Sequence, residues 1–135
     1  MIKVGITGQS GFIGTHLYNF LNLKTDELRV IPFKDEYFRD QHQLEMFVGE
    51  CDTIVHLAAL NRHNDPEVIY NTNIDLVRRL IAALDKTGKK PHILFSSSTQ
   101  EERDNVFGKS KREGRQLLSD WAIRSGGAFT GMIIP

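Results

Sequence analysis

Short apolar runs alternate along the chain with longer segments in which apolar residues recur every three or four positions. The short runs have the length and the β-branched residues of strands, and the longer segments have the period of amphipathic helices. The pattern predicts strands over residues 2–7, 28–33, 53–57, 92–96 and 129–134, with a brief further strand over 37–39. Between them it predicts helices over residues 12–21, 41–48, 66–87 and 110–123. Asp65 suits the N-cap of the long helix, Pro66 its first position, and Gly88 its C-terminal end.

Strands that are apolar throughout and that alternate with helices indicate a parallel sheet with helices on both faces. Since crossovers between parallel strands are right-handed, a doubly wound sheet is the expected arrangement. The chain stops at Pro135, directly after an apolar strand. A strand in such a sheet normally leads into a functional loop, so we interpret the chain as an α/β domain that is truncated after its sixth strand.

The charge balance argues against nucleic acid or an anionic membrane as a partner. Lysine and arginine total 17 and aspartate and glutamate total 17, which leaves no overall field to attract a polyanion. No apolar run reaches the roughly 18 residues of a membrane helix, and the chain enters a strand without room for a signal peptide. The single cysteine, Cys51, fits a reducing compartment, so we expect a cytoplasmic protein.

The five histidines show no metal-ligand spacing, so no metal site is expected.

Residues 7–14 read T-G-Q-S-G-F-I-G, with a glycine at every third position between the first strand and the first helix. In a Rossmann fold the first glycine permits a tight turn, the second lets the backbone approach a pyrophosphate, and the third lets the helix pack closely on the sheet. The N-terminus of the helix adds free N–H groups and positive potential. Residues 1–135 are therefore expected to form one NAD(P)-binding Rossmann domain. The residues assigned to the pyrophosphate site are Gly8, Ser10, Gly11, Phe12, Ile13 and Gly14.

Three further segments occur in the order expected of one enzyme family. Residues 56–59 read H-L-A-A at the end of a strand, residues 96–98 read S-S-S at the end of the next strand, and residues 107–111 read F-G-K-S-K. Together with the glycine loop they resemble the extended short-chain dehydrogenase/reductase family of nucleotide-sugar epimerases, dehydratases and reductases. The short gap after the serines and the L-N-R segment at residues 60–62 look like the reductase/epimerase branch that serves bacterial capsule precursors. The residues that the resemblance places along the cofactor are Leu57, Ala58 and Ala59.

The resemblance assigns chemistry to three side chains and departs from the family at one of them. The family's Y-x-x-x-K tyrosine is its general acid/base, and the lysine binds the nicotinamide ribose and lowers the pKa of the tyrosine. Here Phe107 stands at the tyrosine position and has no proton to transfer. Lys111 is retained, as is Ser98, which is expected to hydrogen-bond the reacting oxygen of the sugar. Three explanations stay open: a deliberate change that traps complexes, a natural variant that uses another group, or a protein that binds without turnover.

The choice of nicotinamide cofactor depends on the residues that follow the second strand. An acidic residue about 20 residues past the glycine loop would select NAD by binding the ribose 2′-hydroxyl. Lys34 comes first and would favour the 2′-phosphate of NADP, whereas Asp35 would favour NAD if the strand runs one residue longer. We favour NADP and keep NAD as the alternative. Asp40 suits either a contact with the adenine amino group, as the resemblance implies, or an ordinary helix N-cap.

The resemblance implies an NAD(P)-dependent epimerase, dehydratase or reductase that acts on a nucleotide-linked sugar, with its activity impaired by Phe107. The alternative is a non-catalytic dinucleotide-binding module with a redox-sensing or regulatory role, which Phe107 favours and the retained Ser98 and Lys111 disfavour. A homodimer formed through paired long helices stays open. The family binds the sugar largely with segments beyond the sixth strand, so we expect the substrate-binding part to be absent and the sugar to stay unspecified.

Overall fold

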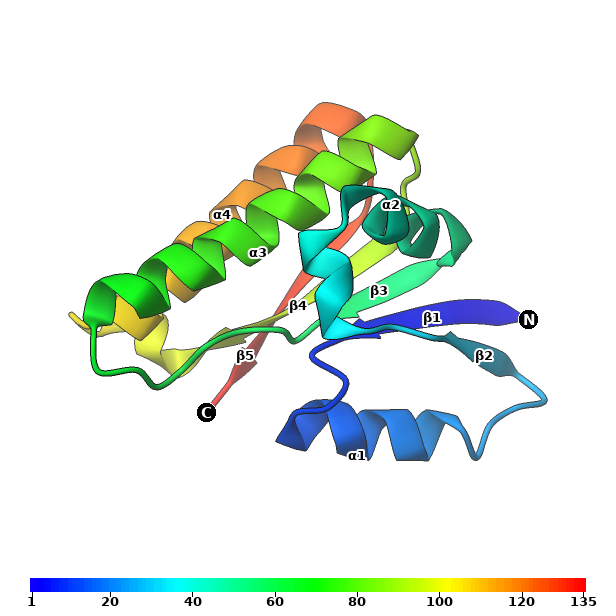
Figure 1. The fold of residues 1–135 in the computed structure, drawn as a ribbon, viewed down its shortest axis with the longest axis horizontal. Helices are drawn as coiled ribbons and strands as arrows, with labels where there is room; N and C mark the ends of the chain where they lie inside the picture. The colour runs from blue at the N-terminus through cyan, green and yellow to red at the C-terminus, as the bar shows by residue number, and fades with distance from the viewer.

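The computed structural model describes residues 1–135 without gaps and contains a parallel sheet of five strands (Figure 1). The strands are β1 (Ile2–Thr7), β2 (Leu28–Ile31), β3 (Thr53–His56), β4 (His92–Ser98) and β5 (Phe129–Ile134), in the spatial order β2-β1-β3-β4-β5. The helices are α1 (Phe12–Leu21), α2 (Gln41–Glu50), α3 (Pro66–Thr87) and α4 (Val106–Ser125), with short 3-10 helices η1 (Asp35–Arg39) and η2 (Thr99–Glu102). Because all neighbouring strands are parallel, their carboxyl ends meet at one edge of the sheet. The predicted doubly wound α/β architecture is confirmed.

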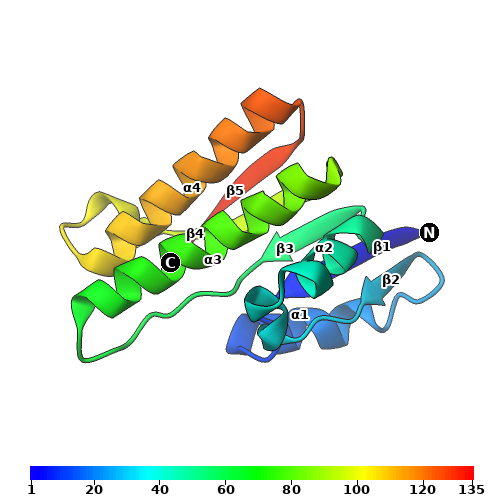
Figure 2. The same cartoon turned by 45° about the horizontal axis from the view of Figure 1, so that its top comes forward.

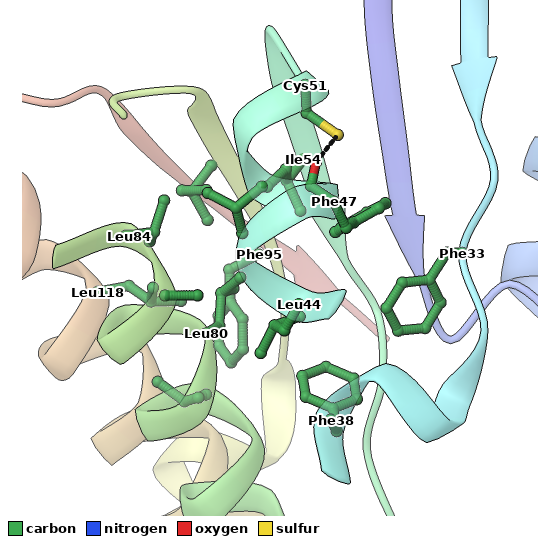
Figure 3. Close-up of a cluster of buried hydrophobic side chains, with 14 of the residues drawn as sticks. Phe33, Phe38, Leu44, Phe47, Cys51, Ile54, Leu80, Leu84, Phe95 and Leu118 are labelled. Carbon is green, nitrogen blue, oxygen red and sulfur yellow. Dashed lines mark hydrogen bonds between the residues drawn. The ribbon is translucent and has the colours of Figure 1, made fainter. Parts of the chain in front are cut away.

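The helices cover the two faces of the sheet unequally, with α2, α3 and α4 on one face and α1 on the other (Figures 1 and 2). Successive residues of a strand point to opposite faces, and β3 shows the division. Ile54 belongs to the larger core, which includes Leu80 of α3 and Leu118 of α4 (Figure 3). The next residue, Val55, belongs to a smaller cluster into which Leu17 of α1 packs.

Cys51 is buried as part of the larger core (Figure 3). Its thiol donates to the backbone oxygen of Phe47, with 3.2 Å between sulfur and oxygen. Burial, reinforced by the charges of Glu50 and Asp52, raises the pKa of the thiol to about 12. The thiol therefore stays protonated near neutral pH. None of the helices combines the length and the apolar character required to span a bilayer.

The brief strand predicted over residues 37–39 is wrong, because these residues form part of η1, and the sheet has five strands rather than six. The N–H of Tyr37 donates to the oxygen of Lys34 (2.9 Å) and the N–H of Asp40 donates to the oxygen of Tyr37 (3.1 Å), which is the pattern of a 3-10 turn. Phe38 is buried in the larger core. The apolar residues that suggested a strand therefore serve packing between η1 and the core.

Several boundaries differ from the prediction for identifiable reasons. β2 ends at Ile31 rather than at residue 33, because Pro32 has no N–H to continue the ladder. α4 begins at Val106 rather than at residue 110, because the Asn105 side chain caps it by accepting a hydrogen bond from the N–H of Gly108 (2.7 Å). β4 continues to Ser98 rather than stopping at residue 96.

The predicted ends of the long helix α3 are confirmed. The Asp65 carboxylate accepts a hydrogen bond from the N–H of Glu67 (2.9 Å), and Pro66 occupies the first turn, where its missing N–H costs nothing. Gly88 follows the last turn with a φ of 67°, in the left-handed region that favours glycine. These ends place the start of α3 near the carboxyl edge of the sheet (Figure 1).

Candidate functional site

The glycine loop joins β1 to α1 in a conformation that strongly favours glycine. Gly8 has a φ of 71°, and a Cβ atom there would lie 2.8 Å from the backbone nitrogen of Ala58. The N–H of Gly11 donates to the oxygen of Gly8 (3.1 Å) and closes the turn. A Cβ atom at Gly14 would lie 2.1 Å from that same oxygen. Glycine is therefore required at position 14 because the helix lies against the backbone of the loop. The sequence had predicted a different reason, the packing of the helix on the sheet.

The N-terminus of α1 presents backbone donors beside this loop. Gly11 is the N-cap and makes no side-chain cap. The N–H of Thr15 donates to the oxygen of Gly11 (2.8 Å), and the N–H groups of the turn before it have no acceptor within the helix. This first turn lines a cavity of about 490 Å³ with Phe12, Ile13 and Gly14. An anion in the cavity would meet both free donors and the positive end of the helix dipole.

Two cavities at the carboxyl edge of the sheet meet at the glycine loop. One, of about 600 Å³, extends over η1 and α3, and the other, of about 490 Å³, extends to the end of β4 and the start of α4. The first gathers the assigned residues Gly8, Ser10, Gly11, Leu57, Ala58 and Ala59. The second gathers the assigned residues Gly8, Gly11, Phe12, Ile13, Gly14, Leu57, Ala59, Ser98, Phe107 and Lys111. The arrangement offers one compartment for each half of a dinucleotide, with the loop between them.

Two of the assigned residues lie outside both cavities. Lys34 is exposed and lines a smaller hollow of about 340 Å³ beside the loop, with Ser10 and Asp35. Asp35 also lines the larger cavity. The carboxylate of Asp40 accepts hydrogen bonds from the backbone N–H (3.3 Å) and the side-chain amide (3.2 Å) of Gln43. Asp40 is thus the N-cap of α2, which was one of its two interpretations.

A buried hydrogen-bond cluster joins the ends of β1 and β3 behind the loop. The hydroxyl oxygen of Thr7 accepts the N–H groups of Leu57 (3.1 Å) and Ala58 (3.2 Å), so its own proton goes to Nδ1 of His56 (2.7 Å). Burial, aided by the charge of Lys111, lowers the pKa of His56 to about 3, which keeps the ring neutral. The cluster fixes the H-L-A-A backbone against the glycine loop. The role of Thr7 was not predicted, although a polar residue that ends an apolar strand directly before a glycine is a recognisable signal.

The end of β4 supplies a hydroxyl group to the second cavity. The Ser98 oxygen accepts the N–H of Gln100 (3.1 Å), and this hydrogen bond caps η2. The Ser98 proton is not used in that bond, so the hydroxyl can donate into the cavity that it lines. This is the polarity needed to hydrogen-bond a carbonyl or alkoxide oxygen.

Lys111 of α4 lies deep in the same cavity, next to Phe107. Its side-chain nitrogen donates to the backbone oxygen of Ser96 (2.9 Å) and lies 4.9 Å from the ring centroid of Phe95 and 5.6 Å from that of Phe107. The residue is only 5% exposed, and burial lowers the pKa of the ammonium to about 8. The structure therefore brings Lys111, Phe107 and Ser98 together at one cavity, as the family resemblance implied.

The free energy of unfolding is expected to rise with pH between about 8 and 10.5 because of Lys111. In this range the unfolded chain holds a proton that the folded chain has released, and below it the folded chain must bury the charged ammonium. The Lys111→Met variant should lose this rise and should be more stable than the original chain at pH 7. Urea unfolding at several pH values checks this, with Lys109→Met, an exposed position on the same helix, as the matched control. An unchanged pH dependence in Lys111→Met would contradict the assignment.

Asn73 ties the loop after β3 to the two long helices. Its side-chain amide donates to the oxygen of Leu60 (2.9 Å) and to the hydroxyl of Ser110 (3.0 Å), and its oxygen accepts the N–H of Leu60 (2.6 Å). The residue is buried, and its side chain bridges the loop after β3 and the start of α4. No group of three or more histidine, cysteine, aspartate or glutamate residues is arranged to hold a metal ion.

Comparison with known proteins places these features in a family. Residues 4–120 match the model of the NAD dependent epimerase/dehydratase family. The chain is 34% identical over 117 residues to the UDP-2-acetamido-2,6-beta-L-arabino-hexul-4-ose reductase of Pseudomonas aeruginosa, an alignment that covers 87% of this chain and 31% of that protein. It is 29% identical over 144 aligned positions to the N-acetyl-alpha-D-glucosaminyl-diphospho-ditrans,octacis-undecaprenol 4-epimerase of Escherichia coli O157:H7, covering 88% of this chain and 43% of that protein.

Solved structures agree with the sequence relatives. The capsular polysaccharide assembling protein CapF of Staphylococcus aureus superimposes with a TM-score of 0.75 at 31% identity, covering 96% of this chain and 33% of that chain. The RMD protein of Pseudomonas aeruginosa in complex with NADPH superimposes with a TM-score of 0.84 at 23% identity, covering 97% of this chain and 53% of that chain. The chain thus spans less than half the length of the two curated relatives described. With the glycine loop, the H-L-A-A segment, Ser98 and Lys111 all within the matched region, the chain belongs to the NAD-dependent epimerase/dehydratase family.

Proposed function

We propose that this chain is the cofactor-binding part of an NADP-linked reductase or epimerase that acts on a nucleotide-linked sugar. The observation that supports this most directly is one cavity that holds both the bare N-terminus of α1 and the side chains of Ser98 and Lys111. The helix N-terminus can bind the phosphates of a dinucleotide, and Ser98 and Lys111 can hydrogen-bond its nicotinamide end and the substrate. Both ends of the cofactor would then lie in the same cavity. NAD in place of NADP is the alternative cofactor.

Each assigned group has a distinct task in this proposal. The turn from Gly8 to Gly14 binds the pyrophosphate, and Ala58 and Ala59 line the path of the cofactor. Lys111 donates to the nicotinamide ribose, because an ammonium has three protons and only one is used on the Ser96 carbonyl. Ser98 donates to the reacting oxygen of the sugar. The bound cofactor supplies or accepts the hydride.

The relatives suggest the class of substrate. The Pseudomonas aeruginosa protein is named as the reductase of a UDP-linked hexul-4-ose, and the Escherichia coli protein as a 4-epimerase of a diphospho-linked sugar. Both names describe chemistry at carbon 4 of a sugar that carries a diphosphate. A sugar of this class is our proposed substrate, with most of its binding surface supplied by segments beyond those described.

Phe107 impairs turnover in this proposal, because its ring borders the cavity but carries no proton. The alternative function is a non-catalytic dinucleotide-binding module with a redox-sensing or regulatory role. The same residue favours it, since a sensor needs no acid/base. The two functions agree on cofactor binding and differ in whether a tyrosine at position 107 creates turnover.

Direct titration of the chain with NADPH and NADH tests cofactor binding. We expect saturable binding of both cofactors, with NADPH bound more tightly, followed by cofactor fluorescence or calorimetry. Absence of binding to either cofactor by a folded chain would refute the proposal. Tighter binding of NADH would replace NADP by NAD without affecting the rest.

The Lys34→Ala variant is expected to weaken NADPH binding by about 10-fold and to spare NADH, because only NADPH carries the 2′-phosphate that the ammonium would contact. Lys34 borders the hollow beside the loop, and this hollow shares Ser10 and Asp35 with the larger cavity. The matched control is Lys89→Ala, an exposed lysine between α3 and β4 that lines neither cavity. Equal weakening of both cofactors in Lys34→Ala would remove this role.

A further inference from the structure

A buried carboxylate lies just behind the candidate site, in the short helix η2. Glu101 is 8% exposed and accepts hydrogen bonds from Nε (3.0 Å) and Nη2 (2.8 Å) of Arg115, as well as from the hydroxyl of Ser97. Its backbone oxygen accepts a hydrogen bond from Arg112 (3.0 Å). None of these groups was assigned a role by the sequence motifs.

The partners of Glu101 belong to the two elements that carry the proposed chemistry. Ser97 directly precedes Ser98 on β4, and Arg115 lies about one turn after Lys111 on α4. A single carboxylate therefore connects the strand that holds the serine to the helix that holds the lysine. Because Arg115 is held by two nitrogens, the contact fixes direction as well as distance.

Backbone contacts keep the start of α4 directly against η2. A Cβ atom at Gly108 would lie 1.9 Å from the oxygen of Gln100, so the helix approaches η2 as closely as glycine permits. The Asn105 amide, whose oxygen caps α4, also donates to the side-chain oxygen of Gln100 (3.1 Å). Ser98 caps the other end of η2. Glu101 thus lies at the centre of a short rigid bridge between Ser98 and the first turns of α4.

The carboxylate is held in its charged form. Burial acts to raise the pKa of Glu101, but hydrogen bonds from Arg115 and Ser97 and the charges of Arg115 and Arg112 outweigh it and lower the pKa. Buried ion pairs often add little to stability compared with apolar packing, and their best-supported benefit is a specific geometry. The position of this pair suggests which geometry it maintains.

We propose that Glu101 is a positioning residue that holds α4 against β4 and thereby fixes the side chains at positions 107 and 111 relative to Ser98. The importance of this geometry for catalysis rests on the proposed function. The geometry itself is a property of the chain and can be tested without cofactor or substrate.

The Lys111 ammonium reports on this geometry, since its pKa depends on how deeply α4 holds it against Ser96. The test compares the Lys111 pKa in the original chain and in Glu101→Gln, by NMR titration of lysine labelled at Cε, with the signal assigned through Lys111→Met. We expect the Lys111 pKa to rise by at least about 0.5 in Glu101→Gln, toward its ordinary value of 10.5, because the loosened helix lets water reach the ammonium.

The direction of the change separates positioning from simple electrostatics. Removal of a carboxylate makes the surroundings more positive, which by itself would lower the pKa of Lys111. A rise therefore reports displacement of the lysine. Arg115→Lys is a second, milder variant that keeps both charges but loses the two-nitrogen contact, and it should also raise the pKa. The matched control is Arg124→Gln, which breaks the exposed pair between Arg124 of α4 and Asp85 of α3 and should leave Lys111 unchanged.

A Lys111 pKa that stays constant or falls in both folded variants would overturn the proposal. Circular dichroism over the pH range establishes which variants are folded. If Glu101→Gln does not fold, the Lys111 pKa in Arg115→Lys alone tests the proposal. NADPH titration of the original chain is independent of these measurements. If the original chain does not bind NADPH, the proposed function is refuted. If the Lys111 pKa does not rise in the variants, only the positioning role of Glu101 is refuted.

Discussion

Replacement of Phe107 by tyrosine is expected to raise turnover by about 10²–10⁴-fold, the usual contribution of a positioned acid/base. The Phe107 ring borders the same cavity as Ser98 and lies 5.6 Å from the Lys111 ammonium, so a hydroxyl on it would enter a site that already holds a cation and a second donor. The cation favours the phenolate and would tune the new acid/base.

The measurement follows NADPH oxidation with the UDP-linked hexul-4-ose named for the Pseudomonas aeruginosa relative. Because the chain spans only part of that relative, the assay uses this chain joined to the remaining segments of the reductase. Phe107→Leu is the matched control, since it changes the side chain without adding a proton. Cofactor binding without any gain in turnover for Phe107→Tyr would favour the non-catalytic module.

The Gly14→Ala variant is expected to lose about 1–3 kcal/mol of unfolding free energy and most of its affinity for NADPH. The added Cβ atom would lie 2.1 Å from the Gly8 oxygen and 2.9 Å from the Gln9 Cα atom, and both are backbone atoms of the glycine loop. The loop must therefore shift to admit a methyl group, which moves the donors that face the pyrophosphate.

Gly49→Ala is the matched control for this substitution. Gly49 lies near the end of α2, is exposed, and has nothing within 4 Å of an added Cβ atom. Alanine there should be neutral or should stabilise the chain by up to about 1 kcal/mol through helix propensity. Chemical unfolding and NADPH titration of both variants check the pair. Equal behaviour of the two variants would show that the close approach at Gly14 has no energetic consequence.

Features that depend on a few neighbouring residues could be predicted from the sequence. The ends of α3 follow from Asp65, Pro66 and Gly88, whose capping preferences act within one helical turn. The glycine loop is equally local, because its spacing only has to bridge one strand and one helix. The alternation of apolar strands with helices predicted the parallel α/β architecture, because strands that are apolar on both faces must be covered by helices on both sides.

The residues at 37–39 show where local pattern fails. Tyr37 and Phe38 are as apolar as strand residues, but η1 packs Phe38 into the larger core and leaves the sheet with five strands. The start of α4 was also placed too late, because Asn105 was not recognised as its N-cap, and the first turn of the helix precedes the segment that was predicted to be helical. For residues 37–39 the packing of Phe38 in the core outweighed the strand pattern of the segment, whereas for α4 a local cap was overlooked.

The order of residues alone determined the class of fold, the glycine loop and the identity of the chemical groups at positions 98, 107 and 111. Only the tertiary structure decided how those groups are oriented and charged. Parallel pairing brings Thr7 to His56 across 49 residues, and burial against Ser96 depresses the Lys111 pKa. Hydrogen bonds and desolvation act through space over a few ångströms, so they follow from which strand ends become neighbours and not from distance along the chain.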